Sequence, residues 1–174
     1  MAGDEVVDIV DENDHVIGTA PRAEVRTRNL RHRAAYILVF NSNGQLFVHQ
    51  RTMQKDVYPG YFDVTAGGLV LAGETYDAAA QRELAEELGI VDAPLRQVLR
   101  FQFADVDNRV VGAVYSCTYG GPLRLQADEI VNGEWLDLDV VLERIAHRSF
   151  CPDGVEALVR YLDRLEQARV RDSR

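Results

Sequence analysis

The segment 68–90 constrains the fold of this chain more than any other. It reads GLVLAGETYDAAAQRELAEELGI. Thr75 can cap the N-terminus of a helix, because its hydroxyl can accept a hydrogen bond from an otherwise unpaired backbone N–H. Gly89 can end that helix in the left-handed conformation, which glycine adopts without a steric penalty. Most residues between them are good helix formers. The segment therefore predicts a glycine-rich loop followed by one helix that ends at Gly89.

Three glutamates of this predicted helix, Glu83, Glu86 and Glu87, are spaced so that their carboxylates share one face. Like charges at this spacing destabilise a helix by about 0.2–0.5 kcal/mol per pair. Hard divalent cations such as Mg²⁺ need oxygen ligands and often share them with substrate phosphates. The three glutamates alone would indicate a solvated acidic helix. Together with the glycine-rich loop, and with Glu74 and Arg82 at fixed spacing, they favour a metal site.

These residues resemble the Nudix box, G-x5-E-x7-R-E-U-x-E-E-x-G-U, in which U is a bulky aliphatic residue. The resemblance holds at every specified position, at Gly68, Glu74, Arg82, Glu83, Leu84, Glu86, Glu87, Gly89 and Ile90. It implies a loop–helix–loop that binds Mg²⁺ or Mn²⁺ and cleaves a diphosphate linked to another moiety. It also implies that Glu74 and Arg82 pair to brace the loop, and that the Gly67 or Gly68 carbonyl is a metal ligand beside the three glutamates.

Composition sets the broad class of the protein. The chain has 174 residues, which suits one domain, expected here to be a single Nudix domain over residues 1–174. A formal charge of −9 argues against a nucleic-acid partner, because phosphate-backbone binding needs clustered Lys and Arg. Cys117 and Cys151 stand in no metal-binding or redox spacing and indicate reduced structural thiols. We expect a cytoplasmic monomer or homodimer that acts on a small-molecule diphosphate, with no membrane-spanning helix and no signal peptide.

Apolar patterning and turn residues predict the remaining elements. We expect strands over 6–10 and 16–20, an N-terminal hairpin within the extension 1–29, and further strands over 30–40, 45–51, 61–65, 95–103, 110–119 and 130–136. Helices are expected over 139–147 and 155–170, separated by Pro152 and Gly154 and frayed from Arg169. Strands on both sides of one central helix fit an α/β class domain. Resemblance to Nudix proteins implies an α/β/α sandwich with a mixed sheet, here with an added N-terminal β-hairpin.

Further residues are candidates for the site. By similarity to Nudix hydrolases that carry a glutamate before a tryptophan-bearing strand, Glu129 is a fourth catalytic carboxylate, although Asp128 could take its place and a solvated loop glutamate is an equal alternative. Arg51 and Lys55 flank the expected cleft and could hold substrate phosphates, or could be surface charges. His32 and His49 lie in strand contexts and are interpreted as structural.

The flanking sequence is similar to the isopentenyl-diphosphate-isomerase-like branch, from Leu30-Arg-His-Arg and from the loop after Gln50-Arg-Thr. Isomerisation is therefore one alternative. Against it, Gly67 stands where the isomerase has a catalytic cysteine and Leu69 where it has a metal-binding histidine, and glycine has no titratable group for proton transfer. A non-catalytic nucleotide-sensing protein is the other alternative, and the intact glutamate set argues against it. The sequence does not identify the substrate.

Overall fold

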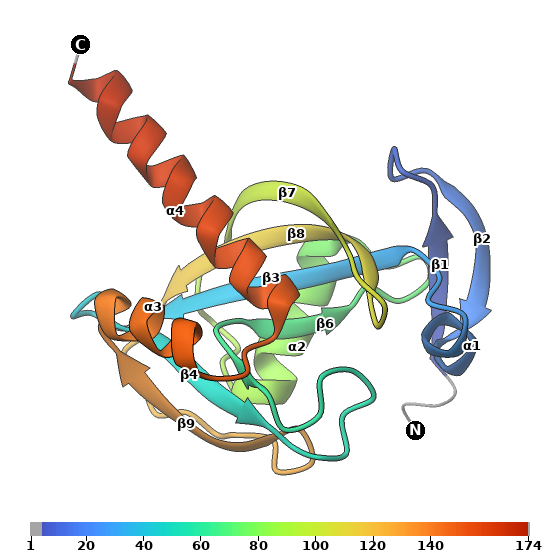
Figure 1. The fold of residues 1–174 in the computed structure, drawn as a ribbon, viewed down its shortest axis with the longest axis horizontal. Helices are drawn as coiled ribbons and strands as arrows, with labels where there is room; N and C mark the ends of the chain where they lie inside the picture. Colours follow the sequence, from blue (N-terminus) through green and yellow to red (C-terminus); the bar gives the residue numbers. More distant parts are fainter. Residues whose placement is uncertain (1–4, 174) are drawn as a thin grey trace.

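The computed structural model describes residues 5–173, which form nine strands and four helices (Figure 1). In chain order these are β1 (Val6–Val10), β2 (Val16–Pro21), α1 (Arg22–Thr27), β3 (His32–Phe40), β4 (Leu46–Arg51), β5 (Phe62–Asp63), β6 (Ala66–Leu69), α2 (Tyr76–Leu88), β7 (Arg96–Ala104), β8 (Arg109–Thr118), β9 (Ile130–Leu136), α3 (Leu138–His147) and α4 (Pro152–Asp172). The N-terminal hairpin, the central helix and the two C-terminal helices of the prediction are all present.

Strand β3 lies at the centre of the sheet (Figure 1). It pairs in parallel with β8 along its whole length, from His32↔Val110 to Phe40↔Thr118, and antiparallel with β6. Strand β7 pairs antiparallel with β8, and β9 pairs antiparallel with β4. Because parallel and antiparallel neighbours occur together, the sheet is mixed, as predicted.

The two faces of the sheet are covered by different helices. Successive side chains of a strand point to opposite faces, so Ile37 and Val39 of β3 join one buried cluster with Leu84 of α2. Leu38, between them, joins a second buried cluster with Leu158 of α4. The sheet therefore lies between α2 on one side and α3 with α4 on the other, and the predicted α/β/α sandwich is confirmed.

The candidate site lies where β3 and β4 separate. These strands pair only beside their connecting turn, at Phe40↔Leu46, and then diverge (Figure 1). Strand β4 pairs instead with β9 and, near its end, with β5. A cavity of about 250 Å³ is lined by residues of β3, β4, β6, α2 and the adjoining loops. Because the two strands diverge, residues of α2 on one side of the sheet and of α4 on the other both line this cavity.

The N-terminal hairpin of β1 and β2, together with α1, forms one wall of this cavity. Val25 of α1 packs in a small buried cluster with Leu69 of β6, which fixes the extension to the sheet. Arg22 and Arg26 of α1 both line the cavity. Their Nε atoms donate to the same carboxylate oxygen of Asp56, at 3.0 and 3.2 Å. The N-terminal extension is therefore part of the site rather than a remote appendage.

Helix α4 differs from the prediction at both ends. It begins at Pro152, so Pro152 and Gly154 lie in its first turn instead of separating it from α3. Proline suits this position because the first helical N–H groups have no intrahelical partner to lose. The helix also continues past Arg169, where fraying was expected, to Asp172. Basic residues in the last turn interact favourably with the negative end of the helix dipole, which favours this extension.

The strand predicted over 61–65 is reduced to Phe62–Asp63. Asp63 Oδ1 accepts hydrogen bonds from the backbone N–H and the hydroxyl of Thr65, at 3.0 and 2.9 Å. Such a local side-chain bond turns the chain and ends the ladder. Asp63 is thereby held at the cavity wall.

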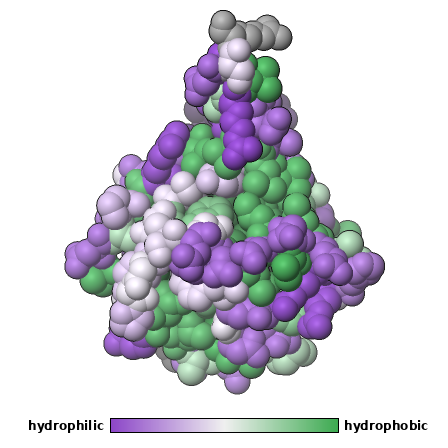
Figure 2. All heavy atoms as spheres, turned by 90° about the vertical axis from the view of Figure 1, so that its left-hand side faces the viewer, coloured by the Kyte–Doolittle hydropathy of each residue, from purple (hydrophilic) through white to green (hydrophobic). Residues whose placement is uncertain are grey.

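The outer part of helix α4 differs in polarity from its base. Helix α4 projects from the body, and its outer part forms the apex of the view in Figure 2, where mainly hydrophilic side chains surround it. Apolar side chains gather lower down, toward the base of the helix. Within residues 5–173, no helix combines the length and the hydropathy that crossing a membrane requires.

Candidate active site

The loop–helix predicted from segment 68–90 forms the floor of the site. Thr75 caps α2, and its hydroxyl accepts from the Ala78 N–H at 3.1 Å. Gly89 ends the helix with a φ of 71°, in the left-handed region. Leu84 and Leu88 are buried against the sheet, so the opposite face of α2 is held toward the cavity and presents the glutamates there.

Glu87 is anchored by the backbone of Gly67. Its side chain is 4% exposed, and its Oε2 accepts from the Gly67 N–H at 3.0 Å. Gly67 has a φ of 138°, and a Cβ on it would lie 2.0 Å from the Ala35 carbonyl oxygen. Any residue with a Cβ at this position would force the backbone of β6 or β3 to move. Burial, followed by the charge of neighbouring Glu83, raises the pKa of Glu87 to about 8, against the opposing effect of Lys55.

Glu83 lies directly against Gly68. A Cβ on Gly68 would come within 2.7 Å of Glu83 Oε1, so the missing side chain leaves room for the carboxylate. The Glu83 side chain is 15% exposed, and burial raises its pKa. Glu86, by contrast, is 52% exposed and lies at the outer edge of the cavity. The three glutamates share one helix face, but at increasing depth from Glu86 to Glu83 to Glu87.

Arg82 connects the loop to the helix. Its Nε and Nη2 donate to the two oxygens of Glu74 at 2.9 and 3.0 Å, and Nη2 also donates to the Leu69 carbonyl at 3.0 Å. Its Nη1 donates to Glu83 Oε1 at 2.7 Å. Burial works against the ionised form of Glu74, but the bonds from Arg82 lower its pKa overall. The fork of Arg82 thus holds the glycine-rich loop and the Glu83 carboxylate at the same time.

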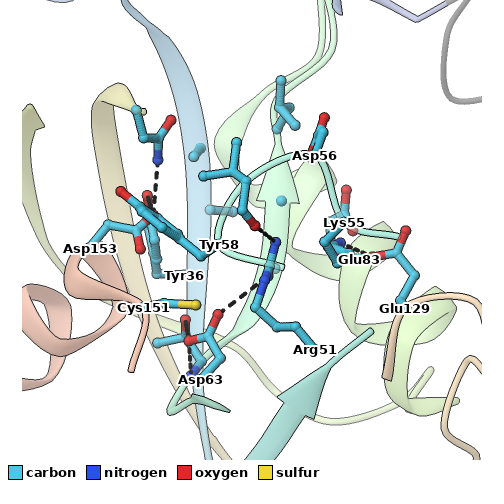
Figure 3. A pocket seen from close by; sticks show the side chains of 18 of the residues that line it. Tyr36, Arg51, Lys55, Asp56, Tyr58, Asp63, Glu83, Glu129, Cys151 and Asp153 are labelled. Carbon is cyan, nitrogen blue, oxygen red and sulfur yellow. Dashed lines mark hydrogen bonds and ion pairs between the residues drawn. The ribbon is translucent and has the colours of Figure 1, made fainter. Parts of the chain in front are cut away.

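Lys55 and Glu129 close the cavity from the other side. Lys55 lies on the loop between β4 and β5, and Glu129 lies just before β9. The Lys55 ammonium donates to the Glu129 carboxylate (Figure 3). The same ammonium lies 4.0 Å from Glu87 Oε1. Burial opposes ionisation of Glu129, yet the Lys55 charge lowers its pKa below the ordinary value. One cation is therefore placed between carboxylates from two separate elements.

This arrangement suits a divalent metal. Within residues 5–173, no three His, Cys, Asp or Glu side chains stand ready around a common metal position. The Lys55 ammonium is the cation there instead, and it serves as a stand-in that shows where positive charge is stabilised. The side chains around it are carboxylates, the hard oxygen ligands that Mg²⁺ and Mn²⁺ accept. The chemistry of these donors therefore fits such an ion.

The inner end of the cavity carries a second polar group (Figure 3). Asp153 Oδ2 accepts from the Tyr36 hydroxyl at 2.8 Å and from the Asn108 amide at 3.0 Å. Burial and the neighbouring Asp63 raise the pKa of Asp153. Arg51 Nη1 lies 3.5 Å from Asp63 Oδ2. This end, between β3 and the first turn of α4, presents hydrogen-bonding groups rather than an apolar surface.

The structure brings most of the predicted site residues together. Gly68, Glu83, Glu86, Lys55 and Glu129 all line the cavity, as does Arg51. Arg51 points toward the inner end, where its Nη2 donates to the Val57 carbonyl at 2.9 Å and its Nε has no partner among the described residues. Glu74 and Arg82 pair beside the cavity, as expected. The residues that sequence reasoning missed are those of the inner end, Tyr36, Asp63, Asn108 and Asp153. The one available signal was an acidic residue inside an apolar run, at Asp63.

The two histidines have no contact that indicates catalysis. His32 and His49 are 2% and 3% exposed. Burial lowers the pKa of each ring to about 4, so both are neutral at physiological pH. His32 Nδ1 is bonded to the Leu30 carbonyl at 2.8 Å. These positions fit the structural interpretation made from the sequence.

Known proteins are similar to this chain in sequence and in fold. A family model described as the NUDIX domain matches residues 30–153. An uncharacterized Nudix hydrolase of Pseudomonas aeruginosa is 49% identical over 159 residues, which cover 91% of this chain and 94% of that protein. The uncharacterized Nudix hydrolase YfcD of Escherichia coli is 42% identical over 164 residues, covering 94% of this chain and 90% of that protein.

Solved structures agree with this relationship. A crystal structure from Deinococcus radiodurans matches with a TM-score of 0.80 and 31% identity, covering 90% of this chain and 98% of that one. The Nudix domain of Shewanella oneidensis NrtR, solved with ADP-ribose, matches with a TM-score of 0.63, covering 84% of this chain and 99% of that one; its 17% identity supports the fold alone. The chain therefore belongs to the Nudix family of pyrophosphohydrolases.

Proposed function

We propose that this chain is a hydrolase that needs Mg²⁺ or Mn²⁺ and cleaves the diphosphate linkage of a nucleoside diphosphate derivative or a similar small phosphoanhydride. One observation carries the proposal: a largely buried cation position at one end of the cavity, between Glu129 and Glu87, the latter being bonded to the Gly67 backbone. A diphosphate brings several negative charges to such a site, and divalent cations are the groups that neutralise them there.

In this proposal Glu83, Glu86 and Glu87 hold the metal together with the Gly68 carbonyl. The ion supplies Lewis-acid activation of water and of a phosphoryl oxygen. Glu87 keeps Oε2 on the Gly67 N–H, so its Oε1, on the side of Lys55, is the oxygen that would either hold the metal or, as a general base, accept the proton of the attacking water. Glu83 and Glu129 are the alternative bases.

The cationic and bracing residues have separate tasks. Arg51 and Lys55 are proposed to hold substrate phosphates, Lys55 at the α2 end and Arg51 on the side nearer the inner end, since both line the cavity and carry hydrogen-bond donors. Glu74 and Arg82 are proposed to brace the loop without touching the metal. Their mutual bonds, and the bond from Arg82 to the Leu69 carbonyl, support this assignment.

The inner end of the cavity supports a polar organic moiety in the substrate. Asp63 and Asp153 would repel a phosphate, so the diphosphate is proposed to lie at the α2 end and the rest of the molecule beside Tyr36 and Asn108. An isoprenoid chain placed there could form no hydrogen bond with these groups, and it would leave the buried Arg51 Nε, which has no partner among the described residues, without one. A sugar or a nucleobase can instead donate and accept hydrogen bonds.

We further propose that the chain descends from the isopentenyl-diphosphate-isomerase-like branch, on the strength of its flanking motifs, without sharing that reaction. The backbone around Gly67 also argues against isomerisation on steric grounds. A cysteine there would place its Cβ against the Ala35 carbonyl oxygen, because the Cβ position is only 2.0 Å from it. The backbone of this site is therefore built for glycine, and the catalytic thiol of an isomerase has no place in it.

The cellular setting remains a proposal as well. We propose a cytoplasmic protein, monomeric or homodimeric, with residues 1–174 forming one domain and no nucleic-acid or membrane partner. Cys117 and Cys151 are both buried as free thiols, which is the usual state in a reducing compartment. The formal charge of −9 supports the absence of a nucleic-acid surface.

The test is a hydrolysis screen with Mg²⁺ over nucleoside diphosphates and triphosphates, dinucleotides, nucleotide sugars and isoprenoid diphosphates. We expect release of phosphate or a nucleotide from at least one compound with a polar organic moiety, and none in excess EDTA. An isomerised isoprenoid diphosphate would support the isomerase alternative. Nucleotide binding without turnover would support the sensing alternative. Undiminished turnover in EDTA would overturn the metal assignment.

A further inference from the structure

The position of Lys55 goes beyond the phosphate-binding role proposed above. Its side chain is only 11% exposed, and its ammonium contacts Glu129 while lying 4.0 Å from Glu87 Oε1. Its charge also acts on Glu83, opposing the effect of burial on that carboxyl. The ammonium thus lies between Glu87, which the proposed function gives to the metal, and Glu129, which it gives as an alternative base.

The composition of the chain makes this lysine distinctive. Lys55 is the only lysine in the sequence, which has 18 arginines. An arginine presents a planar fork that fixes carboxylates in pairs, as Arg82 does with Glu74. A lysine ammonium is instead a compact point charge on a flexible stem, which resembles a small metal ion and can move away. This lysine therefore lies beside Glu87 and Glu129, at a position where a metal ion could replace its charge.

A divalent ion and the ammonium cannot both stay among these carboxylates. Two positive charges in one partly buried site repel strongly, because the low local dielectric screens them little. The backbone of the lysine loop is held to the β9 side by the bond from Thr52 N to the Glu129 carbonyl, at 3.0 Å. When a metal enters, we therefore expect the Lys55 side chain to move rather than the loop backbone. Inside the cavity, the displaced ammonium would contact the diphosphate of a bound substrate.

We propose that Lys55 is an exchangeable internal cation. It neutralises Glu87 and Glu129 when no metal is bound, leaves as the metal enters, and then contacts a substrate phosphate. Metal binding and phosphate binding each favour the displaced lysine, so each raises the affinity for the other. This inference rests on the proposed function for the location of the metal, and adds to it a coupling between metal and substrate.

The first test is Mn²⁺ affinity, measured from the electron paramagnetic resonance signal of free Mn²⁺. Lys55→Met is expected to bind Mn²⁺ roughly tenfold more tightly than the wild type, within the usual range of coupling between sites. Methylenediphosphonate, a diphosphate that is not hydrolysed, should strengthen Mn²⁺ binding in the wild type and do so much less in Lys55→Met. Arg160→Met is the matched control, since it removes the same charge from an exposed pair with Glu156 on α4 and should change neither value.

A second measurement uses the wild-type protein, so it does not depend on a variant. Lysine labelled with ¹³C at Cε gives one side-chain signal in this single-lysine chain. We expect that signal to shift on saturation with Mg²⁺, and to shift again when methylenediphosphonate is added.

The outcomes separate this inference from the proposed function. If the wild type binds Mn²⁺, Glu87→Gln weakens that binding, and Lys55→Met binds like the wild type with an unmoved ¹³C signal, the exchange is overturned while the metal site stands. If the wild type binds no Mn²⁺, the metal site and the exchange fall together.

Discussion

Glu87→Gln is expected to lower kcat by about 10²-fold or more, in the range seen when a general base or a metal ligand is removed. Glu87 is the most buried of the three glutamates on α2, with a side chain that is 4% exposed and bonded to the Gly67 N–H. Glutamine keeps the helix propensity and an oxygen that can accept the Gly67 bond, but it cannot take a proton from water. Steady-state hydrolysis of the best substrate from the screen measures the effect.

Folding of this variant can be anticipated from the charge state of Glu87. Burial favours the neutral form of this carboxyl and raises its pKa to about 8, against the opposing charge of Lys55. A neutral amide should therefore be tolerated, and thermal melting of the metal-free variant checks it. Glu129→Gln, at a carboxylate that is 27% exposed, should fold normally and lose less activity. A folded Glu87→Gln enzyme with wild-type kcat would remove Glu87 from the mechanism.

Gly67→Ala is expected to lower the free energy of unfolding by roughly 2–5 kcal/mol, the sum of a strained backbone conformation and overpacking. The φ of 138° is unfavourable for alanine, and the new Cβ would lie 2.0 Å from the Ala35 carbonyl oxygen. Relief requires β6 to move away from β3, which would also shift the bond from Gly67 to Glu87. Urea unfolding of the metal-free protein measures the loss.

Two other glycines separate the contributions. Gly73 has a φ of 77° with nothing within 4 Å of a built Cβ, so Gly73→Ala reports backbone strain alone. Gly120 has open space and no positive φ, so Gly120→Ala should be close to neutral. We expect the destabilisation to increase from Gly120→Ala through Gly73→Ala to Gly67→Ala. If Gly67→Ala matched Gly120→Ala, the close approach of β6 to β3 would not exist.

The loop and helix of the site could be predicted from the sequence because their signals are local. Thr75 and Gly89 mark the ends of α2 within a few residues of the bonds that they make. The spacing of the glutamates fixes their shared face by helix geometry alone. The spacing could not predict how deeply each side chain is buried: the Glu86 side chain is 52% exposed, while that of Glu87 is 4% exposed. That difference follows from how the sheet meets α2.

The inner end of the cavity could not be predicted, because its residues are distant in the sequence. Tyr36 and Asp153 are 117 positions apart, and they meet only because α4 packs across the sheet beside β3. The sequence indicated a break between helices at Pro152, whereas that proline begins the helix that delivers Asp153. Lys55 was predicted to flank the cleft, and it does, but its contact with Glu129 depends on two loops that the sequence could not place relative to each other.

The central claim is that this site uses a divalent ion to direct water onto a phosphorus atom. Hydrolysis of the best substrate in ¹⁸O-labelled water, followed by mass spectrometry of the products, tests it most directly. With Mg²⁺ present, we predict one ¹⁸O atom in one of the two phosphate-bearing products of the cleaved anhydride and none in the other, and we predict no product in excess EDTA. An ¹⁸O-labelled alcohol released together with diphosphate, which would mean attack at carbon, or unchanged turnover in EDTA, would contradict this mechanism.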